Sequence, residues 1–421
     1  MVKRPAGVRG GHYARAVVTR SARPAWRHTL FGHAFRPFFL LGAAFAAAAM
    51  ALWIGLLDGY APARLALSPA WHGHEMLFGF VGAAIAGFVL TAVANWTGRP
   101  PVRGATLGAL VSCWLAGRVA MLFSERWPAW WVAGLDLLFP VLLCALVGRE
   151  VLGARSRRNY PIAAITGMIA LLDLLHHLAA AGVLGGGERR VLSLMVHLVL
   201  VLITIVAGRI VPAFTRNWLA ARGETRLPRR LPWLERSIVP LTALTGVAAS
   251  ASPTGGATGV LALLCGLAHG LRLGHWRGAA TRAEPIVWVL HAAYLWLPLG
   301  YLLTALAAMG LVLPPVGAQH ALTVGAIGGM ILAVTTRVGL GHTGRPLRAA
   351  QPIVLAYLVL GLAALLRILA PVFDATGTTL LTLSAAGWIF AFGCFVGVYG
   401  PVLTQPRSEG GTVPARRSDR P

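Results

Sequence analysis

The sequence predicts an all-α integral membrane protein with about twelve transmembrane helices. Apolar residues make up 57% and charged residues 12% of its 421 positions, and the mean hydropathy is +0.70. A soluble domain carries about 25% charged residues. Largely uncharged runs of about 20 residues, the length a helix needs to cross a bilayer, recur along the chain. The predicted spans are residues 38–57, 75–96, 104–123, 129–150, 161–182, 191–214, 237–252, 256–274, 285–310, 317–338, 351–371 and 379–403.

The basic residues predict how the chain lies in the membrane. The net charge is +24, and most lysines and arginines fall in the two terminal segments and in alternate connections between spans. This is the positive-inside pattern, which places both termini in the cytoplasm of a bacterial cell and the chain in its inner membrane as a multi-pass protein. The positive charge therefore predicts contact with anionic membrane lipid and not with nucleic acid.

Three regions follow from these patterns. Residues 1–37 form a basic cytoplasmic segment that lacks the apolar core of a signal peptide, and residues 38–403 form the membrane domain. Residues 404–421 are rich in Gly, Pro, Ser and Arg and predict a disordered cytoplasmic tail. The seventh and eighth spans are the weakest, because only a short polar break at 250–256 separates them. Ten spans remain the alternative to twelve.

An internal repeat divides the spans into groups of four. A Thr-Gly-Arg-Pro turn ends the second span and follows the tenth, and a looser version ends the sixth. Each of these spans starts from a histidine on the outer side: His74, His197 and His320. The period predicts three four-helix repeat units. It also pairs His74 with His320.

Six histidines predict a metal or haem site near the outer face. Each is costly to bury in hydrocarbon, and imidazole is the commonest metal ligand. Imidazoles without a cysteine cluster suit haem iron or copper better than an iron–sulfur centre. His291, closer to the inner face, is a further candidate ligand. The six outer-side histidines are His72, His74, His176, His177, His197 and His320.

Spacing limits which of these side chains act together. On a regular helix His72 and His74 point about 200° apart, so they bind one metal only if the helix unwinds at Gly73. Glu75 lies three residues after His72 and is expected to orient that imidazole. Asp173 stands in the same relation to the adjacent pair at 176–177, of which one member at most is expected to bind the metal.

Charged residues elsewhere in the spans have two interpretations. Arg118 and Asp136 predict a buried ion pair. Several arginines near the inner ends either reach the cytoplasmic interface or clamp an anionic group such as a haem propionate. Two histidines flanked by arginines also predict an inner-side cofactor site. The residues of this inner-side group are His33, Arg36, Arg209, Arg337, His342 and Arg345.

Four long motifs resemble the NnrS family over nearly the whole chain. They are FGHAFRPFF at 31–39, WHGHEMLFG at 71–79, ANWTG at 94–98 and RVGLGHTGR at 337–345. Members of that family are multi-span membrane proteins containing haem and copper, linked to nitric oxide, denitrification and resistance to nitrosative stress. The resemblance thus implies a b-type haem, copper, and nitric oxide as the small-molecule ligand.

The function expected from the sequence is a haem- and copper-binding membrane protein acting in nitric oxide metabolism or in resistance to nitrosative stress. The alternative is a secondary transporter or membrane sensor whose histidines relay protons. The sequence leaves open the oligomeric state and whether nitric oxide is turned over or only bound.

Overall fold

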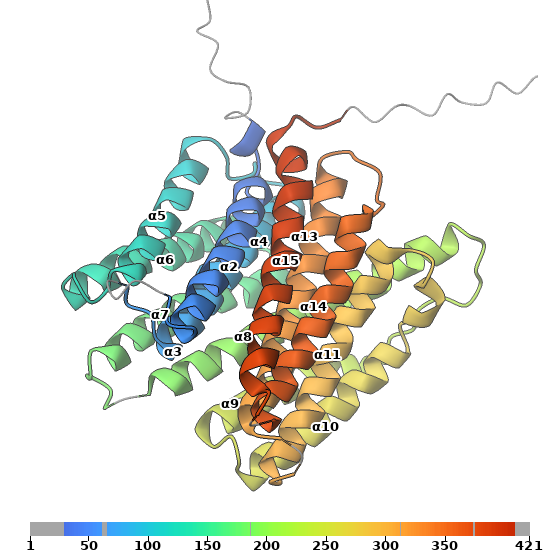
Figure 1. The fold of residues 1–421 in the computed structure, drawn as a ribbon. Coiled ribbons are helices and arrows are strands. Elements are labelled where there is room, and N and C mark those ends of the chain that lie inside the picture. Colours follow the sequence, from blue (N-terminus) through green and yellow to red (C-terminus); the bar gives the residue numbers. More distant parts are fainter. Residues whose placement is uncertain (1–28, 61–64, 186, 312, 374, 409–421) are drawn as a thin grey trace, which may run out of the picture.

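The computed structural model describes residues 29–60, 65–185, 187–311, 313–373 and 375–408, which form twelve spans, all helical (Figure 1). The predicted all-α fold is confirmed. Most of the predicted N-terminal segment and tail lies outside the described residues. The spans are α2 (Phe35–Leu57), α3–η1–α4 (Pro69–His74, Glu75–Val81, Gly82–Thr97), α5 (Ala105–Leu122), α6 (Ala129–Gly153), α7 (Tyr160–Ala180), α8 (Glu188–Ala220), α9 (Pro232–Ala251), α10 (Gly256–Gly274), α11 (Pro285–Ala308), α12–η4–α13 (Pro315–His320, Ala321–Gly328, Gly329–His342), α14 (Gln351–Leu369) and α15 (Gly377–Thr404).

Eleven of these spans are long and apolar enough to cross a membrane. The exception is α9, one of the two spans that the sequence marks as weakest. The lipid-facing surface is also visible on single helices. Four leucines spaced three or four residues apart on α14 are about half exposed, which is the stripe that one face of a helix presents to hydrocarbon. They are Leu355, Leu358, Leu362 and Leu365.

Consecutive helices pack against each other, and α15 closes the bundle by packing against α2. The two ends of the described chain therefore meet at one end of the bundle (Figure 1). Arg36 fixes this junction, because its Nη1 donates to the carbonyls of Leu403 and Gln405, both at 2.7 Å. These carbonyls belong to the last turn of α15 and its cap, which have no intrahelical partner. Chain ends on one side agree with an even number of spans.

Burial is uneven among the spans. In the α3–η1–α4 span 83% of the most apolar stretch is buried, and in α8, α11 and the α12–η4–α13 span 61% is buried, whereas α2 has only 22%. The four most buried spans therefore form the centre of the molecule. They carry five of the seven predicted metal ligands. These are His72, His74, His197, His291 and His320.

Two of the central spans share an irregularity. A π-helical segment begins directly after His74, at Glu75, and another directly after His320, at Ala321. Such segments insert an extra residue into the turn and are frequent at functional sites. Gly73 itself stays helical, so the condition under which His72 and His74 could bind one metal is not met there. The third span of the predicted repeat, α8, is one uninterrupted α-helix, and the four-helix repeat stays a prediction.

Candidate cofactor cavity and buried histidine–carboxylate cluster

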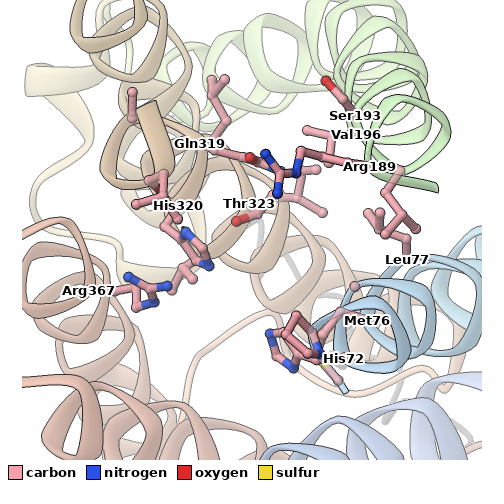
Figure 2. A pocket seen from close by; sticks show the side chains of 18 of the residues that line it. His72, Met76, Leu77, Arg189, Ser193, Val196, Gln319, His320, Thr323 and Arg367 are labelled. Atoms are coloured by element: carbon pink, nitrogen blue, oxygen red, sulfur yellow. The ribbon is translucent and has the colours of Figure 1, made fainter. Parts of the chain in front are cut away.

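A cavity of about 1200 Å³ opens between the helices at the end of the bundle opposite the chain ends. It lies among the ends of α2, α3, α8, α12, α14 and α15. Three of the predicted ligands line it: His72, His197 and His320. Figure 2 shows His320 on one side of the cavity and His72, beside Met76, on the other. Most of the remaining lining is apolar, with Trp53 and Trp388 among it, as is typical of a cofactor pocket.

Two of these histidines are held in the protonation form that a metal ligand needs. The Nδ1–H of His197 donates to the Ser193 carbonyl at 2.9 Å, and that of His320 donates to the Val316 carbonyl at 2.7 Å. Because Nδ1 carries the proton, Nε2 of each neutral ring has a free lone pair. The Nε2 of His197 is buried without a hydrogen-bond partner. Metal-binding histidines commonly donate their second ring nitrogen to a carbonyl in this way.

His72 approaches the cavity from another helix. Its ring stacks on Trp53 at 4.8 Å between centroids and 17° between planes. Its Nδ1 is buried and has no hydrogen-bond partner. A buried polar atom without a partner costs about 1–3 kcal/mol, so this nitrogen is available to a ligand that satisfies it. The cavity therefore combines three imidazoles that the described protein does not satisfy.

Two arginines line the same cavity, and sequence reasoning did not single them out. Arg367, near the end of α14, is partly buried and has no hydrogen bond or ion pair to any described residue. Arg189 is exposed at the mouth. Figure 2 places Arg367 beside His320. The signal in the sequence was a single arginine in an otherwise apolar span, since an intramembrane charge without a counter-ion indicates a ligand of opposite charge.

A second group of polar side chains lies beside the cavity but faces away from it. His74, Asp136, Asp173 and His177 offer four ligand atoms within 4.8 Å of one another, and this group could hold a metal ion. The first three are at most 1% exposed. They come from three helices, α3, α6 and α7. His176 packs its ring at 4.7 Å from that of His74 but is not one of the four.

Two further residues complete this group. Glu75 Oε1 lies 3.0 Å from His74 Nδ1 and accepts from Arg118 Nη1 at 2.5 Å. Arg118 Nη2 also donates to Asp136, which confirms the expected ion pair between them. Glu75 was expected to orient His72, and that expectation is wrong, because its Oε1 interacts with His74 and Arg118. We call His74, Glu75, Arg118, Asp136, Asp173 and His177 the buried cluster.

The predicted inner-side group is assembled only in part. Phe35 lies between two of its histidines, with ring centroids 6.0 Å from His33 and 5.5 Å from His342. Burial, Arg36 and the other positive groups nearby lower the pKa of His33, which keeps the imidazole neutral. The arginines are engaged with the chain itself: Arg36 as described above, and Arg345 with the Gln405 side chain at 3.2 Å. A cofactor role for this group stays a prediction.

The other candidates stand apart. His291 Nε2 lies 2.7 Å from the Thr215 hydroxyl. Among the described residues His291 belongs to no group of metal-binding side chains. Arg337 lies over the Phe214 ring at 3.9 Å, and Arg209 is partly buried on α8. None of the three lines the cavity.

His269 provides the contrast that defines the cavity histidines. It is fully buried, yet its Nδ1 lies 2.7 Å from the Tyr294 hydroxyl and its Nε2 3.0 Å from the Thr242 hydroxyl. Both ring nitrogens are therefore satisfied by protein, as in an ordinary core histidine. In the cavity, none of the three imidazoles has hydrogen-bond partners in the described protein at both ring nitrogens.

Comparison with known protein families decides the relationship of the chain. The family model described as NnrS protein matches residues 29–407, which is nearly the whole chain. The chain belongs to the NnrS family. No curated protein matches it.

In this NnrS-family protein five of the six outer-side histidines divide between two sites, and His176 belongs to neither. His72, His197 and His320 line the cavity, whereas His74 and His177 belong to the buried cluster. The repeat pairs His74 with His320, and both do precede a π-helical segment. Their surroundings nevertheless differ.

Proposed function

We propose that this NnrS-family protein binds a haem in the cavity and acts in nitric oxide metabolism or in resistance to nitrosative stress. The proposal includes the predicted setting, a bacterial inner membrane with both termini in the cytoplasm. The observation that carries it is the convergence of three incompletely satisfied imidazoles and an unpaired arginine on one large cavity. Family membership supports the link to nitric oxide.

The donor set of the cavity fits a haem. His320 would be the iron ligand, because its Nδ1–H bond to Val316 fixes the ring and leaves Nε2 free. Arg367 and Arg189 match the two propionates of the cofactor, which are anionic. His72 lies across the cavity from His320 (Figure 2) and would be a second residue to hold the cofactor. A haem bound there would supply the iron to which nitric oxide binds.

Copper is the second cofactor of this proposal. The four cysteines of the chain, Cys113, Cys144, Cys265 and Cys394, are free, and no thiolate cluster exists among the described residues. Copper ligands would therefore be imidazoles and carboxylates, which suit the divalent ion.

An optical spectrum of the purified full-length protein in detergent tests the haem proposal. We expect a Soret band, about one haem per chain by the pyridine haemochromogen method, and a shift of the band when nitric oxide is added without oxygen. His320→Ala should remove the band. The proposal would be refuted if the wild-type protein showed no Soret band and took up no added haem.

His275→Ala is the matched control for this test. His275 makes the same bond from Nδ1 to the carbonyl four residues earlier, Leu271, at 2.8 Å. It lies at the C-terminal end of α10, outside the cavity. Its replacement should leave haem content unchanged, which separates loss of the iron ligand from loss of a helix-end contact.

A further inference from the structure

We infer that the buried cluster binds a divalent first-row transition-metal ion, at a site separate from the haem cavity. The ligands are His74 Nε2, Asp136 Oδ2, Asp173 Oδ1 and His177 Nε2. The geometry, the charge balance and the surrounding hydrogen bonds lead to this inference independently. It does not depend on the haem proposal.

The ligand atoms are already spaced for a four-coordinate ion. His74 Nε2 lies 2.9 Å from Asp173 Oδ1 and 3.0 Å from Asp136 Oδ2. His177 Nε2 lies 3.0 Å from Asp136 Oδ2 and 3.9 Å from Asp173 Oδ1. A tetrahedral ion with bonds of about 2.0 Å requires ligands about 3.3 Å apart. Each of these four separations therefore needs to change by well under 1 Å, and all four ligand atoms lie within 4.8 Å of one another.

The charge of the cluster calls for a cation. Three carboxyl groups, those of Glu75, Asp136 and Asp173, surround one guanidinium, that of Arg118, and all four side chains are at most 5% exposed. With all three carboxyl groups ionised and both imidazoles neutral, as metal binding requires, the group carries two uncompensated negative charges. Without a metal, protons on the cluster balance them, because both ring nitrogens of His74 lie within 3.0 Å of carboxylate oxygens. An unpaired buried charge costs several kcal/mol, so a divalent ion stabilises the group by making it neutral. Two carboxylate oxygens, Glu75 Oε2 and Asp173 Oδ2, are also buried without a hydrogen-bond partner.

The hydrogen bonds around the ligands are those of a metal site. With a metal on Nε2, the Nδ1–H of His74 donates to Glu75, and Arg118 holds that carboxylate in place. The other oxygen of Asp136 accepts from Arg118 as well. Carboxylates placed behind metal-binding histidines set the ring orientation and raise the basicity of the ligand. Arg118 thus positions two carboxylates of the site at once.

The donor set selects the kind of ion. Two imidazoles and two carboxylates suit zinc, iron(II) or copper(II), while copper(I) prefers sulfur ligands and magnesium and calcium prefer oxygen alone. A cavity of about 10 Å³ beside the cluster touches Arg118 and Asp173. It has room for about one water molecule. The site is closed, and its role is to join α3, α6 and α7 directly below the turn that carries His72.

Metal analysis of the full-length protein tests this inference. The protein is stripped with a chelator in detergent, dialysed separately against Cu²⁺, Zn²⁺ and Fe²⁺, and measured by mass spectrometry of the elements. We expect about one equivalent per chain of at least one of these ions, and a rise in the thermal midpoint when it is added. The ion that binds most tightly identifies the natural metal.

Asp173→Asn should lower the affinity at least about tenfold, since loss of even an outer partner of a metal ligand costs that much. His177→Gln is a second ligand variant in case the first does not fold. Glu150→Gln is the control, because Glu150 is a buried carboxylate on α6 that pairs with Arg99 at 2.5 Å, outside the cluster. It should keep both the metal and the thermal shift.

Two results would overturn the inference: no stoichiometric binding of any of the three ions by the wild-type protein, or wild-type affinity in both ligand variants. The absorption spectrum of the same samples keeps the two proposals apart. Metal without haem contradicts the haem proposal and leaves this inference intact. Zinc or iron binding without copper binding contradicts only the copper of the proposed function, whereas haem without any second metal contradicts this inference.

Discussion

Replacing Arg367 by leucine tests whether the cavity recognises the propionates of a haem. Arg367 lines the cavity and has no ion pair to a described residue, so its charge is free to meet an anionic ligand. A carboxylate at 4 Å gains about 4 kcal/mol at an effective dielectric constant of about 20. The side chain is only partly buried, so solvent reduces this gain. A net value of about 1.5–3 kcal/mol is realistic for a hydrogen bond to a charged group, which corresponds to a loss of about 10–100-fold in haem affinity.

The assay is a titration of the haem-free protein with haem and, in parallel, with the dimethyl ester of haem, whose propionates carry no charge. Wild-type protein should bind the ester more weakly than haem, and Arg367→Leu should reduce the affinity for haem but hardly that for the ester. Arg190→Gln is the control, because this exposed arginine on α8 directly follows Arg189 but does not line the cavity. Equal affinity of wild-type and Arg367→Leu protein for haem would refute the reasoning, as would an equal loss for both ligands.

Three further predictions concern the scaffold. Arg36→Gln removes both bonds to the end of α15, at a cost of about 3 kcal/mol, so amide hydrogens of its last turn should exchange faster; unchanged exchange would contradict the role given to Arg36. Arg118→Gln leaves two buried carboxylates, those of Glu75 and Asp136, without their cation and should destabilise the protein by about 3–5 kcal/mol; an unaltered thermal midpoint would contradict this. Since the pKa of His33 is lowered in the folded state by burial and by Arg36, the unfolded chain takes up the proton first, near pH 6.5. Stability at this end should therefore fall as the pH drops below about 6.5, and His33→Gln should abolish the effect in hydrogen exchange measured between pH 7.5 and 5.

The positions of the spans were predictable because each depends only on its own residues. The length of the uncharged runs placed the ends of all twelve helices within six residues. The predicted break at 250–256 is confirmed, because α9 ends and α10 begins there. Only α9 falls short of the composition of a membrane span, and its polar first turns, with Glu235 and Arg236, explain why.

The partners within the site were not predictable, because they come from other helices. His74 meets Asp173, 99 positions further along the chain, and His177 meets Asp136, 41 positions earlier. A helical projection of one span cannot show which neighbour faces it. The π-helical turn that starts at Glu75 also breaks the regular angular spacing on which the pairing of Glu75 with His72 depended.

Two arguments were nevertheless available in the sequence. The ion pair of Arg118 and Asp136 was expected from their similar depth in adjacent spans, and the same logic of intramembrane charge applies to Arg367. The sequence could not show that this ion pair lies next to His74 or that Arg367 lies beside His320, because these residues come from different helices.

The most direct test of the central claim is the haem spectrum of His320→Ala, recorded with and without free imidazole. The account predicts that this variant loses the Soret band and regains it when imidazole fills the space left by the side chain, while His275→Ala keeps the wild-type spectrum throughout. A His320→Ala protein that retains the wild-type band and its shift with nitric oxide would show that His320 does not hold the iron.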